Sequence, residues 1–240
     1  MTMVKKVLIL LPTYNEGENL SRLCEEILTV VPYAHILIID DNSPDGTGRI
    51  ADGLARKDSD RIFVVHRNGK LGLGTAIMAG FEYAIGSGYE FVVNMDCDFS
   101  HDPRDLQRLL AKAADSDLVI ASRHIPGGGV VGWNRQRKFL HWLAQKYTEV
   151  VLGGWASDYT NSYKAYRVEM LKKLPFTRFA EKVRGFVWHT LLIWMIHKKG
   201  FRISEIPSIF VDRRAGESKM SFKEMASGLW AILKFRFLNV

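Results

Sequence analysis

The sequence predicts an α/β fold in which helices cover both faces of a mostly parallel sheet. Three observations predict it. Short apolar runs alternate with segments of helical periodicity through the first half of the chain. Each run has at least three apolar residues in succession, as in strands that are buried on both faces. Polar clusters follow the runs, at the edge where a parallel sheet binds its ligands.

The first half of the chain contains five apolar runs that are short enough to be strands. In chain order they are Val7–Leu11, Ile36–Ile39, Ile62–Val65, Phe91–Met95 and Asp117–Ala121. Apolar residues at helical spacing occupy the intervals, at 20–31, 48–57 and 74–85, and a further helix is expected after Pro103. Proline is tolerated at a helix start because its missing N–H would have no helical partner there.

The second half of the chain is less regular. Gly127–Gly129 is a flexible break and a candidate hinge, but not a domain boundary. A mixed basic and aromatic helix is expected over Trp133–Leu152, a strand within Arg202–Val211, and a C-terminal amphipathic helix at Phe222–Phe237. The chain has 240 residues and no internal repeat, so a single domain over 1–240 is expected.

Composition limits the partners and the compartment. Lys and Arg number 33 against 26 Asp and Glu, a net charge of +7, so an anionic partner is favoured. No motif supports nucleic acid as that partner. The spacing of Cys24 and Cys97 suits neither zinc nor a disulfide, so a reducing compartment is expected. The N-terminus lacks the apolar region of a signal peptide, and no stretch has the apolar length to span a bilayer.

Two acidic pairs stand at the ends of expected strands. Asp96 and Asp98 flank Cys97, and at a strand end both carboxylates can turn toward one hard cation such as Mg²⁺ or Mn²⁺. The alternative is that they cap the following helix. Asp40 and Asp41 could accept hydrogen bonds from a ribose or a base, although turn chemistry also explains aspartates in front of so many turn-forming residues.

A basic loop follows the last expected strand. Arg213 and Lys219 flank it and Gly216 lies inside it, so the loop could close over a diphosphate and stabilise its negative charge. The alternative is a solvated basic loop without a ligand.

Together these motifs resemble those of the dolichyl- and polyprenyl-phosphate mannose synthases, which are family 2 glycosyltransferases with the fold called GT-A. The resemblance runs through nearly the whole chain in the same order, and its specificity comes from the set of motifs. The segments that carry it are Leu11–Leu20, Ile39–Thr47, Gly72–Ala76, Met95–His101, Ser122–Arg123, Arg137–Lys138 and Phe210–Lys219.

The resemblance implies an enzyme that transfers a hexose, with inversion, from a nucleotide-sugar donor to a polyprenyl monophosphate. The donor would be GDP-mannose, and the cofactor a divalent metal, Mg²⁺ or Mn²⁺. Residues 1–125 would form the nucleotide-binding half, and residues 126–240 the acceptor-side and interface half.

The resemblance also implies roles for matching positions. The nucleoside would be held by Pro12, Tyr14, Glu16, Ile39 and Asp41. Asp96, the Cys97 backbone and Asp98 would hold the metal and the donor diphosphate, and Arg123 and Arg137 the acceptor phosphate. Arg213 and Lys219 would engage the donor from a mobile loop. Catalysis would depend on Asp98, on Arg123, which would also contact the donor, and on Arg213 and Lys219.

Two places depart from the family pattern. Asn161 stands where such enzymes commonly carry glycine, and His189 stands near a usual glutamine without the acidic residue that commonly follows it. These departures put the sugar identity in question more than the reaction type. The alternatives are another donor such as UDP-glucose, a non-catalytic nucleotide-sugar-binding subunit, and an aspartate-nucleophile phosphatase, whose motif order the chain does not match.

A lipid acceptor implies work at a membrane surface. The helices expected at Trp133–Leu152 and Phe222–Phe237 mix basic and aromatic residues, so they could lie in the interface with Trp230 and Phe235 as apolar anchors. The alternative is that both helices cover the sheet. The expected location is cytoplasmic and peripheral, on the cytoplasmic face of a membrane, and the sequence leaves open a small membrane-anchoring subunit as a partner.

Overall fold

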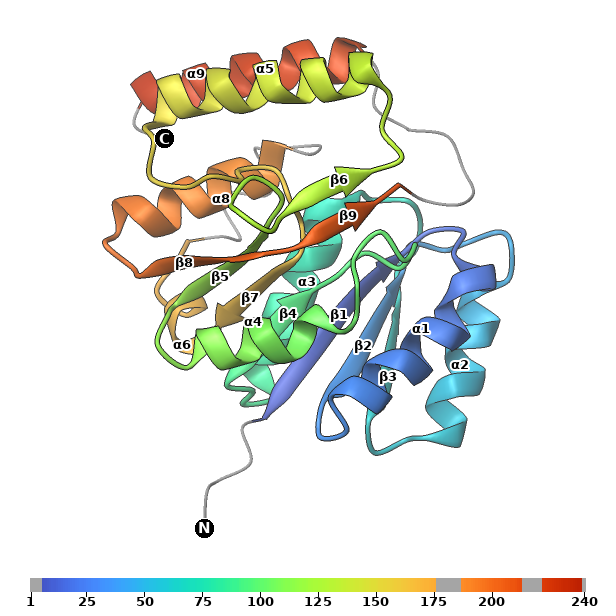
Figure 1. Ribbon diagram of the computed structural model, residues 1–240. Coiled ribbons are helices and arrows are strands. Elements are labelled where there is room, and N and C mark those ends of the chain that lie inside the picture. The colour runs from blue at the N-terminus through green and yellow to red at the C-terminus, as the bar shows by residue number, and fades with distance from the viewer. Residues whose placement is uncertain (1–5, 176–186, 213–221, 239–240) are drawn as a thin grey trace.

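Helices and strands alternate in the computed structural model, which describes residues 6–175, 187–212 and 222–238. Its main sheet has seven strands in the order β3-β2-β1-β4-β7-β5-β8, and a smaller sheet pairs β6 with β9 (Figure 1). The strands are β1 (Val7–Thr13), β2 (His35–Asp40), β3 (Ile62–His66), β4 (Phe91–Asn94), β5 (Leu118–Ser122), β6 (Gly129–Val131), β7 (Lys164–Arg167), β8 (Ile203–Pro207) and β9 (Ile209–Val211).

The helices lie in the intervals between strands and in a layer farther from the sheet. They are α1 (Gly17–Val30), α2 (Thr47–Lys57), α3 (Leu73–Gly86), α4 (Asp105–Ala113), α5 (Arg135–Leu152), α6 (Val168–Leu171), α8 (Val187–Lys198) and α9 (Phe222–Leu238). The predicted α/β class with a mostly parallel sheet and flanking helices is therefore confirmed.

The five predicted strands are all present and run parallel to one another. Alternate side chains of β1 enter two different cores: Leu8 and Leu10 pack on one face of the sheet, and Ile9 and Leu11 on the other. Because both faces are covered by helices, both sets must be apolar. This is why the strands appear in the sequence as continuous apolar runs.

Strand β7 was not predicted from the sequence. It lies antiparallel between β4 and β5, with Ala165 opposite Val93 on one side and Val119 on the other. Its sequence, Lys164-Ala-Tyr-Arg167, is short and half charged, so it lacks the apolar pattern of a buried strand. Pairing with two neighbours that are distant in sequence makes it a strand.

The strand expected within Arg202–Val211 is confirmed but divided in two, and the hinge expected at Gly127–Gly129 was wrong. The segment Arg202–Val211 forms two strands in different sheets, since β8 pairs with β5 and β9 pairs with β6. Gly127–Gly129 is a packed turn and not a hinge, because a Cβ on Gly128 would lie 2.4 Å from the Ser122 carbonyl oxygen. The Gly129 N–H also donates to the Ser208 carbonyl, at 3.1 Å.

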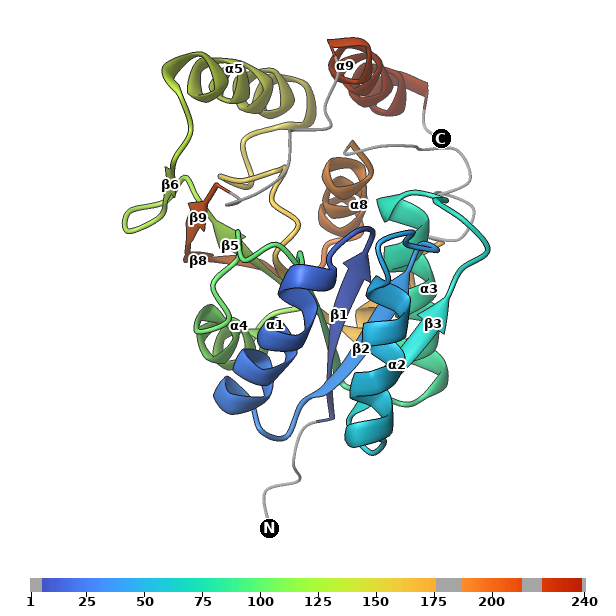
Figure 2. The same cartoon turned by 90° about the vertical axis from the view of Figure 1, so that its right-hand side faces the viewer.

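Helices α5 and α9 lie side by side above α8, on the far side of it from the sheet (Figures 1 and 2). The Tyr147 hydroxyl on α5 donates to the Leu229 carbonyl on α9, at 2.9 Å. We call these two helices the roof. Of the two anchors expected on α9, Trp230 is exposed but Phe235 is buried in the core, so the prediction for Phe235 was wrong. No described helix combines the length and apolarity needed to cross a bilayer.

Gly80 allows α3 to lie close against β1. A Cβ added there would come 2.4 Å from Cδ2 of Leu10, a fully buried side chain with no room to retreat. We expect Gly80→Ala to lower the free energy of unfolding by about 1–3 kcal/mol, as overpacking does. Urea unfolding measures this. Gly86→Ala, on the same helix but with no atom within 4 Å of the added Cβ, is the matched control and should not destabilise the protein.

Candidate active site

The carboxyl ends of β1 and β2 carry loops that are bonded to each other. The Glu16 N–H donates to Thr47 Oγ1 at 2.9 Å, and the Gly17 N–H donates to Asp45 Oδ2 at 3.1 Å. Asp45 also accepts from the Thr47 N–H, at 2.9 Å, at the start of α2. These bonds hold the two loops together at the edge of the sheet where the polar strand ends were predicted to meet.

The turn chemistry considered for Asp40 is present, since its Oδ2 accepts a hydrogen bond from the Ser43 N–H at 3.2 Å. The buried Asp41 carboxylate has a different partner set. Its Oδ2 accepts from the N–H groups of Leu71 and Gly72, both at 3.1 Å, and its Oδ1 lies 2.8 Å from Arg67 Nη1. Asp41 thereby holds the loop after β3 against the end of β2.

The other predicted nucleoside residues lie along the same edge. Pro12 on β1 stands opposite Ile39 on β2. The Tyr14 ring has Lys70 Nζ over it, 4.2 Å from the ring centroid. This arrangement brings Pro12, Tyr14, Glu16, Ile39 and Asp41 onto two adjacent loops and strand ends, and their contact with a nucleoside stays a prediction.

Asp96 and Asp98 lie just beyond the end of β4. Asp96 Oδ2 accepts from the Ser162 hydroxyl at 2.9 Å, and Asp98 Oδ1 accepts from the Ser100 N–H at 3.0 Å. The Cys97 side chain between them points into the core, where burial raises the pKa of the thiol well above its ordinary value. Cys97 therefore stays protonated and can serve a ligand only through its backbone.

The donor set at this place fits a hard divalent cation that substrate phosphates help to hold. It consists of the oxygens of two carboxylates, the ligand type that Mg²⁺ and Mn²⁺ prefer. In the described part of the chain no three His, Cys, Asp or Glu residues surround a common metal position. A Mg²⁺-type site uses one or two carboxylates and takes its other ligands from water and phosphate.

His101 fixes the loop that carries the two aspartates. Its Nδ1 accepts from the Asp96 N–H at 3.1 Å, and its Nε2 lies 3.0 Å from Asn161 Oδ1, so the neutral ring with the proton on Nε2 satisfies both contacts. Burial lowers the pKa of His101, which keeps the ring neutral. Asn161 also donates to the Ala121 carbonyl. Asn161 thus connects this loop to the end of β5.

Arg123 is held by a carboxylate that the sequence did not single out. Asp158 is 0% exposed, and its oxygens accept from Arg123 Nε and Nη2, both at 2.8 Å. Burial by itself raises the pKa of Asp158. The charge and hydrogen bonds of the Arg123 guanidinium lower this pKa by more, so it lies well below its ordinary value. Arg123 is itself only 8% exposed, so most of its hydrogen-bonding capacity faces the protein.

The second predicted acceptor-side cation, Arg137, lies close to the first. Trp133 is near both, with the guanidinium of Arg137 4.4 Å and that of Arg123 5.8 Å from its rings. Arg137 Nη1 also contacts both oxygens of Asp212, at 2.9 and 3.0 Å. The fold therefore brings together the two arginines that the resemblance implies for the acceptor phosphate.

Two buried basic residues lie in this region, Lys164, which the sequence analysis missed, and His189, which it named only as a departure from the family pattern. Lys164 on β7 is fully buried, and burial lowers its pKa to about 7. His189 at the start of α8 is buried as well, and burial lowers its pKa well below the ordinary value. Neither Lys164 Nζ nor the His189 ring nitrogens have a hydrogen-bond partner within the described residues. Arg213 and Lys219 lie outside the described residues.

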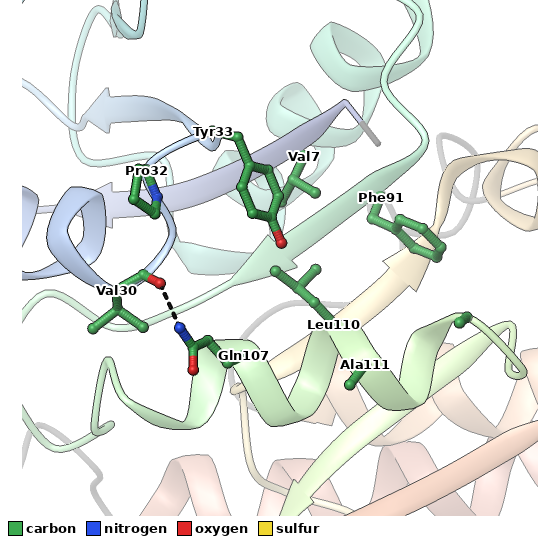
Figure 3. A pocket seen from close by; sticks show the side chains of 9 residues that line it. Val7, Val30, Pro32, Tyr33, Phe91, Gln107, Leu110 and Ala111 are labelled. Carbon is green, nitrogen blue, oxygen red and sulfur yellow. Dashed lines mark hydrogen bonds between the residues drawn. The ribbon is translucent and has the colours of Figure 1, made fainter. Parts of the chain in front are cut away.

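The larger of two hollows lies away from this edge. It has a volume of about 420 Å³ and lies between α4, the end of α1 and the start of β1, with an apolar lining that includes Val7, Phe91 and Leu110 (Figure 3). A second hollow, of about 280 Å³, is polar and lies beside Asp40 and His66 at the carboxyl ends of β2 and β3. Only the second adjoins the candidate site.

Comparison with known proteins gives a consistent set of relatives. Residues 8–175 match the model of the family "Glycosyl transferase family 2". The chain is 40% identical over 232 residues, 96% of its length and 87% of the relative's, to a polyprenol monophosphomannose synthase from Mycolicibacterium smegmatis. It is 41% identical over 216 residues, 90% of its length and 88% of the relative's, to an undecaprenyl-phosphate mannosyltransferase from Micrococcus luteus.

A solved structure shares the fold. Glucosyl-3-phosphoglycerate synthase from Mycobacterium tuberculosis, in complex with Mn²⁺, UDP and glucosyl-3-phosphoglycerate, matches with a TM-score of 0.66. The match covers 97% of this chain and 80% of that one at 19% identity, so it bears on the fold alone.

We expect Asp158→Asn to destabilise the protein by about 3–5 kcal/mol at neutral pH, because the substitution leaves Arg123 buried without its counter-charge. A carboxyl whose pKa is lower in the folded than in the unfolded protein stabilises the folded state when the pH is above its unfolded pKa of about 4. This stabilisation is lost as the pH falls below that value. Urea unfolding near pH 7 and near pH 3.5 should therefore show a smaller acid-induced loss in Asp158→Asn than in the wild type.

Glu169→Gln is the matched control for that prediction, since Glu169 pairs with Lys172 at the exposed surface. It should change stability little at either pH. An Asp158→Asn variant as stable as the wild type at neutral pH would contradict the structural role given to the Asp158–Arg123 pair.

Proposed function

The chain belongs to glycosyl transferase family 2, and we propose that it transfers mannose from GDP-mannose to a polyprenyl monophosphate. It is a glycosyltransferase with an α/β fold of the GT-A type. The proposal for the acceptor is supported by relatives at about 40% identity that are named for polyprenyl-phosphate mannose synthesis. One observation carries the proposal at the level of the site: a single segment, 158–162, contacts Asp96 of the acidic pair and Arg123 of the basic pair.

That segment connects the two halves of the proposed reaction. Ser162 donates to Asp96, on the side where the donor diphosphate would lie. Thr160 and Asp158 accept from Arg123, on the side where the acceptor phosphate would lie. We therefore propose that residues 1–125 form the nucleotide-binding half and residues 126–240 the acceptor-side and interface half, with Arg123 at the end of the first half and segment 158–162 where the two meet.

The proposed step is a single displacement. An oxygen of the polyprenyl phosphate attacks the anomeric carbon of mannose, the bond to the nucleoside diphosphate breaks, and the configuration inverts. A phosphate has its second pKa at about 6, so the nucleophile is already anionic at neutral pH and needs no general base. The two arginines offset the repulsion between acceptor phosphate and donor diphosphate.

A divalent cation held by Asp96 and Asp98 would supply positive charge to the leaving diphosphate. The Ser162 hydroxyl donates to the Asp96 carboxylate, and the His101 ring accepts from the Asp96 N–H, so both the side chain and the backbone of Asp96 are held by the protein. Arg213 and Lys219, which the sequence predicts on a loop closing over the donor, would add to the same charge stabilisation.

The roof is the proposed membrane contact. Exposed apolar side chains on α5 include Phe139, Trp142 and Leu143, and those on α9 include Trp230 and Phe237. Exposed lysines, Lys138 on α5 and Lys234 on α9, accompany them. Aromatic and basic side chains on one surface suit the interface of an anionic membrane. The proposed location is peripheral, on the cytoplasmic face of a membrane, and the small membrane-anchoring subunit stays a prediction.

We expect Asp98→Ala to lower kcat/KM for mannosyl transfer about 100-fold or more, because it removes charge stabilisation of the leaving group. The assay uses GDP-mannose, farnesyl phosphate and Mn²⁺. Asp102→Ala is the matched control, since Asp102 is a nearby aspartate that pairs with Arg104 at the surface. Mn²⁺ should raise the melting temperature of the wild type only when nucleotide is present.

Unchanged turnover in Asp98→Ala would contradict the metal assignment. Transfer from UDP-glucose but not from GDP-mannose would contradict the proposed donor and leave the acceptor assignment in place. Nucleotide-sugar binding without transfer to any polyprenyl phosphate would favour a non-catalytic subunit.

We expect binding to anionic vesicles that weakens with salt. Each cation near such a surface contributes about 1 kcal/mol, so Lys138→Glu with Lys234→Glu should reduce partitioning about 30-fold or more. Arg56→Glu with Lys57→Glu makes the same charge change at the end of α2, far from the roof (Figure 1), and should have little effect. Vesicle flotation measures both variants, and an absence of wild-type binding at low salt would mean that the roof does not dock the protein.

A further inference from the structure

Two histidines contact each other on the acceptor side of the site. His124 follows Arg123 beyond the end of β5, and His141 lies on α5, one turn after Arg137. Their rings are stacked, with centroids 5.2 Å apart and planes at 17°. The two Nε2 atoms are 3.0 Å apart, which is the distance of an N–H···N hydrogen bond.

Such a contact requires one ring to donate and the other to accept, so at least one ring must be neutral. Burial and then Arg123 lower the pKa of His141 to about 3, with smaller contributions from His124 and Arg137 and opposition from Asp158. Burial also lowers the pKa of His124, where Asp158 and Glu205 oppose the effect and Arg123 adds to it. At neutral pH both rings are therefore neutral. The Nε2–H of one ring then donates to the unprotonated Nε2 of the other.

The surroundings of the pair favour an anion over a metal cation. Trp133 packs edge-on against His141, with centroids 5.0 Å apart, and its rings also contact the Arg137 and Arg123 guanidinium groups. A divalent cation between the imidazoles would face both arginines. An anion would meet two rings that can each become a donor.

The charges on this surface explain why a bound anion would draw further positive charge from the histidine pair. Arg123 is already paired with Asp158, and Arg137 with Asp212. Each arginine therefore already shares its positive charge with a carboxylate before a ligand arrives. Among the described side chains around Trp133, the two histidines are the groups whose positive charge can increase when a phosphate dianion binds.

We propose that His124 and His141 are acceptor-binding residues that take up a proton when the acceptor phosphate binds between them. The N–H···N hydrogen bond breaks, a proton from the solvent adds to the free ring nitrogen, and both Nε2–H groups donate to phosphate oxygens. No covalent bond of the substrate changes in this step. The inference rests on the proposed function, because it names the polyprenyl phosphate as the anion.

Isothermal titration calorimetry of the full chain with farnesyl phosphate tests the proton uptake. Near pH 8 the free phosphate is a dianion, so a proton gained on binding goes to the complex. Titrations in buffers of different ionisation enthalpy should show an uptake approaching about one proton per phosphate. The uptake should vanish in His124→Gln with His141→Gln and persist in the control His66→Gln, an exposed histidine that contacts Asp52.

The pH dependence of transfer gives an independent measurement. If one proton is taken up when farnesyl phosphate binds, binding becomes tighter as the pH falls. The wild-type KM should therefore decrease by up to about tenfold between about pH 8 and pH 7. The double variant should have a KM that barely changes over this range and is about tenfold or more above the wild type near pH 7. His124→Gln alone, at the more exposed ring, tests the same point with less disturbance of α5.

Outcomes that contradict the inference differ from those that contradict the function. Transfer to farnesyl phosphate with no proton uptake, or with equal uptake in the double variant, would overturn the role of the histidine pair and leave the function intact. A wild-type protein that binds GDP-mannose but neither binds nor mannosylates farnesyl phosphate would overturn both.

Discussion

The buried carboxylate of Asp158 is the interaction on which the geometry of the site depends. A charge at 0% exposure is tolerable only if its oxygens are fully hydrogen-bonded, and Asp158 accepts from the Arg123 backbone and guanidinium and from the N–H groups of Thr160 and Asn161. These donors come from the end of β5 and from the loop before β7. The ion pair therefore fixes that loop against the sheet at the point where the site begins.

Once the loop is fixed, its other residues are in position for the acidic half of the site. Asn161 contacts His101, whose ring accepts from the Asp96 N–H, and Ser162 donates to the Asp96 carboxylate. The same loop contacts Arg123 through Asp158 and Thr160. In the proposed reaction it thus holds one residue on the side of the leaving diphosphate and one on the side of the anionic nucleophile.

Helix α5 connects the acceptor side to the surface of the molecule. It carries Arg137 and His141 close to Trp133, while Phe139 and Trp142 on the same helix are exposed. In the proposed function this one helix would contact both the phosphate and the membrane that holds its lipid. The depth at which the roof enters the interface would then set the distance from the phosphate to the donor.

The sequence by itself determined the α/β class, the five parallel strands and the edge where their polar ends meet. These features are local, because a strand covered on both faces must be apolar at every position and a parallel sheet exposes its strand ends together. The sequence also points to Asp96, Asp98, Arg123 and Arg137 through motifs that belong to the resemblance, and their roles in the reaction stay predictions. It was wrong about Gly127–Gly129 and Phe235, where packing against distant residues decides the outcome.

Tertiary structure alone decided the features that depend on pairing between distant segments. Strand β7 is polar in sequence and exists because β4 and β5 both bond to it. The burial of Asp158 and Lys164, and the contact between His124 and His141, follow from folding segments of ordinary polar composition against one another. Charged residues in an irregular segment carry no periodicity that would reveal burial, so their partners become visible only when the chain is folded.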